Sequence, residues 1–124
     1  MNISSGTTFS GTGVTFYFIN GASFTISGGA TANLSAPTSG DYSGILFYQD
    51  PTDAAADEFS GGSAGNINGI FYLPAANLTM ANGSAATFST DLVVGSLSMS
   101  GAATLRPYAP LTGASPLSSP NLAE

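Results

Sequence analysis

The stretch that decides the fold is residues 16–34, FYFINGASFTISGGATANL, because the chain repeats its pattern at residues 70–88, IFYLPAANLTMANGSAATF. The two segments align without a gap, and apolar residues fall on apolar residues: Phe24 on Leu78, Ile26 on Met80 and Leu34 on Phe88. Self-similarity of this kind is the signature of repeat architectures, in which each unit buries its hydrophobic face against its neighbours. The sequence therefore predicts a repeat protein.

Further copies of the motif occur along the chain. ISGGATANL at residues 26–34 is matched by FSGGSAGNI at residues 59–67, and shorter copies read ISSGTTF and MSGAATL. Each copy begins with an apolar residue, and we call these the anchor residues: Ile3, Ile26, Phe59, Met80 and Met99. Because stacked repeats bring equivalent positions together, we expect the anchors to form a core ladder in neighbouring layers of one interior.

Within each copy the apolar residues alternate with small polar ones. Phe24 and Ile26 alternate with Ser23, Thr25 and Ser27. This period of two places one side chain in a core and the next in solvent, as in a β-strand. Asn-Gly and Gly-Gly pairs follow several of these segments and supply the positive φ angles that tight corners require. No stretch shows the apolar stripe of a helix.

Short strands with such turns could form an antiparallel sandwich or a parallel solenoid. We favour the solenoid, because equivalent residues recur once per coil, whereas a sandwich has no reason to repeat itself at that period. The predicted fold is all-β: a parallel β-solenoid (β-helix) of about four to five short coils over residues 1–105. Residues 106–124 hold four of the seven prolines and no repeat, and they predict an extended Pro/Ser-rich tail or cap.

The charge content excludes several classes of function. Charged residues make up only 6% of the 124 residues, and the net charge of −6 includes a single cation, Arg106. One cation cannot neutralise a row of phosphates, so nucleic-acid binding and electrostatic attachment to anionic lipid are excluded. No run of 18 apolar residues occurs, so we expect no membrane insertion. The scarcity of Lys and Arg suits an extracellular or cell-surface protein exposed to trypsin-like proteases.

The inventory of side chains also argues against catalysis. The chain has no His, Cys, Lys or Trp, which removes Ser-His and Cys-His pairs, Schiff-base lysines and thiolate or imidazole metal sites. Carboxylates remain, and four of them crowd one segment: Asp50, Asp53, Asp57 and Glu58. A glycosidase needs two carboxylates that face each other across a cleft, which four acids on one loop fit poorly. We therefore expect a protein that is not an enzyme.

The same four acids, Asp50, Asp53, Asp57 and Glu58, have two further interpretations. Clustered carboxylates are ligands that Ca²⁺ prefers, although their spacing matches no EF-hand loop. The other interpretation is a solvated loop that leaves one corner of the coil and supplies solubility to a charge-poor molecule. We favour the solvated loop and expect no cofactor, with calcium as the alternative.

Paired aromatic residues recur at Tyr17-Phe18, Phe47-Tyr48 and Phe71-Tyr72. We expect the phenylalanines to pack in the core and the tyrosines to stack at its rim, with sugar binding by Tyr48 and Tyr72 as the functional alternative. The outward Ser, Thr and Asn side chains would form a regular polar surface. Such a surface favours contact with another copy of the chain, and ice binding is a lesser alternative.

One segment resembles a known family. GDYSGILFYQD at residues 40–50 follows NLSAPTSG at residues 33–40 and precedes GNINGIFYLPAANLTM at residues 65–80. This sequence resembles the C-terminal region of Tad pilus-assembly (TadG-like) proteins. In that bacterial family an exported Ser/Gly-rich repeat region follows a membrane-anchored part. The resemblance implies a surface or envelope location and a structural role, with no catalytic residues to carry over. The family's anchor is missing here, so we expect a fragment or a standalone repeat region.

The ends of a solenoid suggest the function. Terminal coils expose apolar core and unpaired backbone unless a cap covers them. We therefore expect a non-catalytic extracellular structural protein whose partner is itself, joined end to end into a surface fibre or a pilus-related assembly. The alternative is a monomeric adhesin-like module that binds carbohydrate or a surface.

Overall fold

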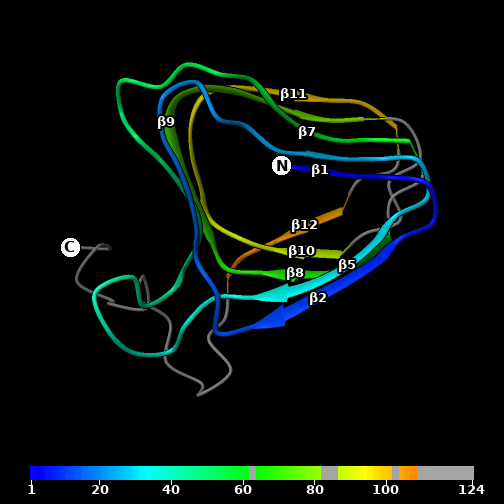
Figure 1. Ribbon diagram of the computed structural model, residues 1–124, viewed down its shortest axis with the longest axis horizontal. Helices are drawn as coiled ribbons and strands as arrows, with labels where there is room; N and C mark the ends of the chain where they lie inside the picture. Colours follow the sequence, from blue (N-terminus) through cyan, green and yellow to red (C-terminus); the bar gives the residue numbers. More distant parts are fainter. Residues whose placement is uncertain (62–63, 82–86, 102–103, 109–124) are drawn as a thin grey trace.

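A computed structural model describes residues 1–61, 64–81, 87–101 and 104–108, and all regular structure in these residues is β (Figure 1). The strands are β1 (Asn2–Ile3), β2 (Thr8–Thr12), β3 (Phe16–Phe18), β4 (Thr25–Ile26), β5 (Thr31–Ser35), β6 (Ile45–Gln49), β7 (Asp57–Phe59), β8 (Ala64–Asn68), β9 (Ile70–Met80), β10 (Thr87–Ser89), β11 (Leu92–Met99) and β12 (Thr104–Arg106). Within that part of the chain no helix is long and apolar enough to cross a bilayer.

Every pairing between these strands is parallel. One sheet has the order β1-β4-β7-β9-β6-β3, with β11 also paired to β9, and the other has the order β12-β10-β8-β5-β2. The all-β class and the parallel sheets predicted from the repeat are therefore confirmed. The antiparallel sandwich is excluded for the described residues, because its hairpins would pair neighbouring strands in opposite directions.

The chain returns repeatedly to the same three sides of a ring, which gives three ladders of strands. The first ladder contains β1, β4, β7 and the C-terminal halves of β9 and β11; the second contains β2, β5, β8, β10 and β12; the third contains β3, β6 and the N-terminal halves of β9 and β11. In Figure 1 the first ladder lies at the top and the second at the bottom. This curled arrangement is compatible with a β-solenoid.

The anchor residues lie in register along the first ladder. Ile3 is opposite Ile26, Ile26 is opposite Phe59, Phe59 is opposite Met80, and Met80 is opposite Met99. The first four anchors are buried, but Met99 is 45% exposed. Met99 therefore does not share the interior expected for it, because β11 is an edge strand and no strand of the described chain pairs with its outer side.

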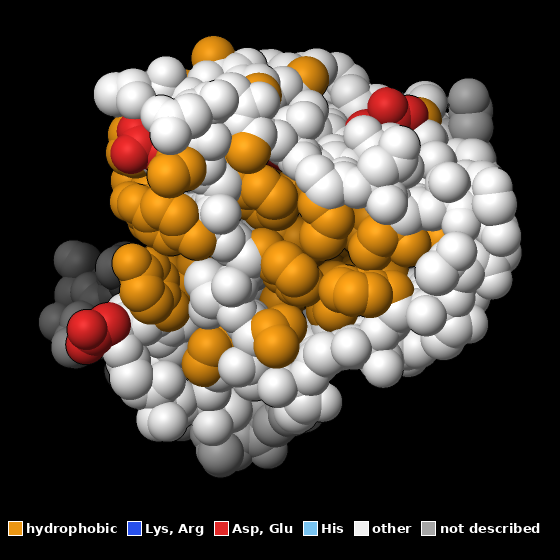
Figure 2. All heavy atoms as spheres, viewed as in Figure 1, with side chains coloured by type: hydrophobic (Ala, Val, Ile, Leu, Met, Phe, Trp, Pro, Cys, Tyr) orange, Lys and Arg blue, Asp and Glu red, His pale blue; other side chains and the backbone are white. Residues whose placement is uncertain are grey.

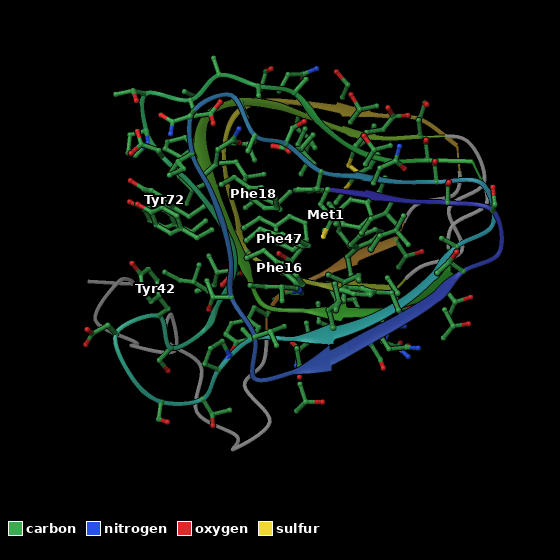
Figure 3. The ribbon with its side chains drawn as sticks, in the orientation of Figure 1. Met1, Phe16, Phe18, Tyr42, Phe47 and Tyr72 are labelled. Carbon is green, nitrogen blue, oxygen red and sulfur yellow. The ribbon has the colours of Figure 1, made fainter. Side chains whose placement is uncertain are left out.

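The interior is filled largely by phenylalanine. Phe24, Phe47 and Phe71 are fully buried, and they meet at centroid distances of 4.4 Å for Phe24–Phe47 and 4.8 Å for Phe47–Phe71. Figure 3 shows Phe16, Phe18 and Phe47 pointing into the ring of strands. Alternation explains this arrangement, because every second residue of a strand points to the same face. In β5, for example, Ala32 and Leu34 are buried while Asn33 is exposed.

The corner that joins the first and second ladders depends on glycine. Gly28, Gly29 and Gly61 all have positive φ, and the N–H of Gly29 donates to the carbonyl of Gly61 at 2.9 Å. A Cβ on Gly61 would lie 2.9 Å from the backbone nitrogen of Gly28, so successive corners stack too closely for a side chain.

Little of the expected tail falls within the described residues. β12 ends at Arg106, one residue beyond the boundary proposed between the repeat region and the tail. Tyr108 is buried, and its N–H donates to Asp91 Oδ1 at 3.4 Å. Residues 109–124 lie outside the described part of the chain.

Candidate functional site

The two ends of the stack of strands are the first candidate surface. We call β1, β2 and β3, together with the residues directly next to them, the N-terminal end, and β11 and β12 the C-terminal end. Each of these strands has a paired strand on one side only among the described residues. An unpaired strand edge presents free N–H and C=O groups, which are a template for pairing with another chain.

Exposed apolar side chains gather at these two ends. The N-terminal end carries Met1, Tyr17 and Ile19, and the C-terminal end carries Val93, Leu97 and Met99, each between 38% and 50% exposed. The N-terminal strands lie nearest the viewer in Figure 2, where hydrophobic side chains occupy the middle of the face and acidic ones lie at its margin. Met1 lies over the interior in Figure 3. Contiguous apolar surface of this kind is typical of interaction sites.

A cluster of tyrosines forms the second candidate surface, on the outside of the third ladder. Tyr17 and Tyr48 stack at 4.8 Å with their planes 9° apart, and Tyr48 and Tyr72 stack at 5.1 Å and 20°. Tyr42 lies edge-on to Tyr17 and Tyr48, at 6.2 and 6.0 Å. Desolvation and the neighbouring tyrosines raise the pKa of Tyr48. Tyr42 and Tyr72 project outward from the ring in Figure 3.

The geometry of this stack limits what it can bind. A sugar packs its C–H groups against the face of an aromatic ring, where the electron density is highest. The faces of Tyr48 are occupied by Tyr17 and Tyr72, so mainly ring edges and hydroxyls point to solvent. Tyr17, at the N-terminal end, is 50% exposed and has one face without a stacked tyrosine. Tyr42 could not be predicted from the repeat, because this residue comes from a loop outside the repeated strands.

The four acids do not converge on a metal site. No three of the described carboxylates form a group able to hold a metal ion. Asp50 Oδ1 instead accepts hydrogen bonds from Thr52 N at 2.8 Å and Thr52 Oγ1 at 2.6 Å, which lower the pKa of Asp50. Asp53 accepts from Gly21 N at 2.8 Å and Ala55 N at 3.0 Å. These contacts tie the segment to the neighbouring turn, so the carboxylates act as acceptors for backbone N–H groups.

The solvated-loop interpretation is wrong for two of these acids. Asp53 is 6% exposed and Asp57 is 1% exposed. The reason is backbone hydrogen bonding: a buried N–H needs an acceptor, and these carboxylates supply one. Asp57 and Glu58 are neighbours in β7 with side chains on opposite faces, since Asp57 is buried and Glu58 is only half-buried. They therefore do not face each other across a cleft.

Asp57 and Gln49 introduce polarity into the core. Asp57 Oδ1 accepts the N–H of Phe24 at 2.8 Å, while Oδ2 has no hydrogen-bond partner. Burial raises the pKa of Asp57 to about 6, opposed by the hydrogen bond from Phe24. Gln49 is fully buried, and its Nε2 donates to the carbonyls of Ala55 at 3.1 Å and Ala22 at 3.3 Å. Sequence reasoning missed Gln49, although its place two residues after Phe47 puts it on the inward face.

The polar surface follows the predicted alternation. On the first ladder Thr25 is opposite Glu58, and Thr79 is opposite both Glu58 and Ser98. Side chains also bond between successive strands: Ser96 Oγ contacts Asn77 Oδ1 at 2.9 Å, and Asn33 Oδ1 accepts Asn66 N at 3.1 Å. This surface is a regular array of hydroxyl and amide groups, which Glu58 interrupts on the first ladder.

No protein-family model, curated protein or solved structure matches this chain. The likeness to Tad pilus-assembly proteins, which covers about residues 13–105, therefore stays a prediction from the sequence.

Proposed function

We propose that this chain is a non-catalytic structural protein of the cell exterior, a β-solenoid of four to five coils that associates with other copies of itself. The number of strands in each ladder supports the coil number, because the first and second ladders contain five successive strands and the third contains four. The Ser/Gly-rich repeat and the likeness to Tad pilus-assembly proteins support a role in a surface fibre or pilus-related assembly.

The observation that carries the proposal is the distribution of exposed apolar side chains. Within the described part of the chain, seven large hydrophobic residues are exposed; six of these belong to the two ends, and Tyr42 lies elsewhere. Burial of apolar surface stabilises an interface by roughly 25 cal/mol per Å². Solenoids that remain monomeric cover their ends with polar caps. Here the described ends combine apolar side chains with unpaired strand edges, which favours contact between copies.

The low charge content supports the same proposal. Six acidic residues lie among the described residues, and none belongs to β1, β2, β3, β11 or β12. The only charged side chain in these edge strands is Arg106. Two ends can therefore approach without repulsion between like charges, whereas lateral contact would bring the acidic segments of two copies together.

Sedimentation velocity over a range of concentrations, with negative-stain microscopy of the same samples, tests the proposal. We expect elongated particles whose length grows with concentration. Leu97→Lys places a charge in the C-terminal end and should reduce the particles to monomers, whereas Thr79→Lys adds the same charge on the lateral surface and should not. Dispersed monomers of the unaltered protein at high concentration would refute self-association.

The tyrosine cluster favours a second candidate function, an adhesin-like module for carbohydrate. Tyr17 and Tyr42 are about half exposed and lie together with Tyr48 and Tyr72 on one side of the molecule. A glycan array tests this function. Binding that is lost in Tyr48→Ala and Tyr72→Ala, with both variants folded, would support it, and the absence of any bound glycan would dismiss it.

A further inference from the structure

We infer that copies of the chain join head to tail through only two of the three sides of the ring, the first and second ladders. Ser98 of one copy then lies opposite Asn2 of the next, and Thr104 lies opposite Ser10. The third side, which carries the tyrosines, stays open by one strand. The inference rests on the proposed self-association and adds to it the orientation of the copies and the strands that meet.

The number of strands on each side decides which sides join. Among the described residues the first and second ladders each contain five successive strands, whereas the third contains four. A second copy that continues both five-strand ladders is displaced by five strand spacings, roughly 24 Å. The same displacement leaves β3 of the next copy two spacings from β11, so a slot one strand wide remains on the third side.

The direction of the strands fixes the orientation of the second copy. All pairings between the described strands are parallel. A copy translated along the stack presents its β1 to the C-terminal half of β11 and its β2 to β12, and these new pairs are parallel too. A copy that is turned over would meet the same edges antiparallel. The translated contact is heterologous: it leaves a free end on each side and grows into a filament.

The backbone groups at the two edges of the first ladder are complementary. In a parallel sheet, alternate residues of a strand direct their N–H and C=O groups to the same neighbour. The carbonyls of Met1 and Ile3 accept hydrogen bonds inside the molecule at 2.8 and 2.9 Å, so the groups of Asn2 point outward. At the other edge the N–H of Ser100 donates into the molecule at 2.9 Å, so the groups of Met99 point outward. When Ile3 of the next copy lies opposite Met99, the free groups of Asn2 and Met99 face one another.

The second ladder fits the same displacement. The carbonyl of Thr7, just before β2, and the carbonyl of Arg106, at the end of β12, both accept hydrogen bonds inside the molecule at 2.8 Å. By alternation, outward groups belong to Ser10 on β2 and to Leu105 on β12. The column of equivalent residues that begins at Ser10 ends at Thr104. Continuing this column places the carbonyl of Ser10 of the next copy beside the N–H of Leu105.

The side chains at the joint are apolar on both sides. In this register Leu97 of one copy meets Met1 of the next, and Met99 meets Ile3. Leu97, Met99 and Met1 are 41%, 45% and 38% exposed in the single molecule, and Met1 lies over the interior in Figure 3. No acidic residue belongs to the four strands that meet. The joint therefore covers apolar side chains of both ends without burying a carboxylate.

Engineered disulfides test the joint, because the natural chain contains no cysteine. Asn2→Cys/Ser98→Cys probes the first ladder and Ser10→Cys/Thr104→Cys probes the second, and all four side chains are exposed. In-register Cα atoms of neighbouring strands lie about 5 Å apart, within the range that a disulfide bridges. Inside one copy each pair is four strand spacings apart, roughly 19 Å. We expect both oxidised variants to give dimers, trimers and larger species on a non-reducing gel, all lost on reduction.

Two further pairs are matched controls. Tyr17→Cys/Val93→Cys spans the slot on the third side, roughly 10 Å, and should not cross-link. Asn2→Cys/Ser96→Cys is two residues out of register, roughly 8 Å apart at the joint, and should not cross-link either. Under reducing conditions all variants should sediment like the unaltered protein, which shows that they still fold and associate.

The outcomes separate the inference from the proposed function. Oligomers in solution with cross-links in fewer than both in-register pairs, or in either control pair, would overturn the two-sided joint and leave self-association standing. Dimers of Ser98→Cys alone would mean that two C-terminal ends meet, which also overturns it. An unaltered protein that stays monomeric at high concentration would refute self-association, and the inference would fail with it.

Discussion

Asp57 occupies an inward position of β7, where it is opposite Leu78 and accepts the N–H of Phe24. Its carboxyl is almost fully buried, and one oxygen has no hydrogen-bond partner. The charged form is therefore disfavoured in the folded protein, since its lost hydration is only partly replaced. The nearby Asp53 carboxylate acts in the same direction, and the N-terminal ammonium opposes it.

This environment predicts a fold that is more stable in mild acid. The pKa of Asp57 rises from 3.8 to about 6 on folding, so the folded state binds the proton more tightly than the unfolded chain. The contribution of Asp57 to the free energy of unfolding should be highest below pH 3.8 and decrease as the pH rises to about 6. The decrease corresponds to about 3 kcal/mol. Urea unfolding across this pH range measures it.

Asp57→Asn should remove this pH dependence and raise stability at neutral pH, because the amide keeps an acceptor for Phe24 N and never ionises. Asp41→Asn changes the net charge equally at an exposed site and should leave the slope unchanged. A slope that persists in Asp57→Asn would assign it to another group.

Gly65 is a second residue of interest, because its position accepts only glycine. Its φ is +115°, and a Cβ built on it would lie 2.0 Å from the carbonyl oxygen of Ala32, which is backbone and cannot move aside cheaply. We expect Gly65→Ala to destabilise the fold by more than about 3 kcal/mol, measured by thermal unfolding. Gly13→Ala is the matched control: φ is +68° there, nothing lies within 4 Å, and only backbone strain of about 1 kcal/mol applies.

At the scale of elements, β9 connects two sides of the ring. Its first half pairs with β6 and its second half pairs with β7, and β11 follows it with a register shift between Val94 and Ser96. β9 therefore turns the corner with more residues than β11 uses. Gly95 lies at that shift, and a Cβ there would be 2.9 Å from backbone atoms of Ala75 and Ala76. The close approach of the two strands explains a small residue at this corner.

The fully buried Phe71 makes β9 the centre of the core. It contacts Phe47 at 4.8 Å and Phe59 at 5.9 Å between ring centroids. Phe71→Ala should lower the free energy of unfolding by about 3 to 5 kcal/mol, because it leaves a cavity among rigid neighbours. Val93→Ala, on the exposed edge strand, should lower it by less than about 1 kcal/mol in the monomer. If denaturant unfolding shows that the two variants lose the same free energy of unfolding, the core does not centre on β9.

At the scale of the whole molecule, the acidic residues of the described chain lie outside the edge strands, while the two ends expose apolar side chains. Contacts between ends should therefore be driven by hydrophobic burial, which is entropic near room temperature and weakens on cooling. We expect oligomers in sedimentation experiments to become shorter at about 4 °C than at about 25 °C. They should survive about 1 M NaCl, which screens ion pairs. Dissociation by salt would instead indicate a contact built from charges.

Much of the fold could be predicted because it depends on local pattern. Alternation over Ser23–Ser27 indicates a strand, and the return of the same motif places Ile3, Ile26, Phe59 and Met80 opposite one another. Stacked copies of one motif have a single way to align their apolar residues. The candidate surfaces were harder to predict: Tyr48 and Tyr72 follow from the repeat, whereas Tyr42 reaches the cluster from a loop.

By itself, the sequence determined that the chain is all-β with parallel strands. It also determined which residues lie opposite one another on neighbouring strands, because both features depend on spacing along the chain. The tertiary structure decided the burial of particular side chains. Asp57 is buried because the backbone of Phe24 needs an acceptor, and Met99 is exposed because no described strand pairs with the outer edge of β11. The burial of a side chain depends on the residues that pack against it, and in this fold those residues come from another coil of the chain.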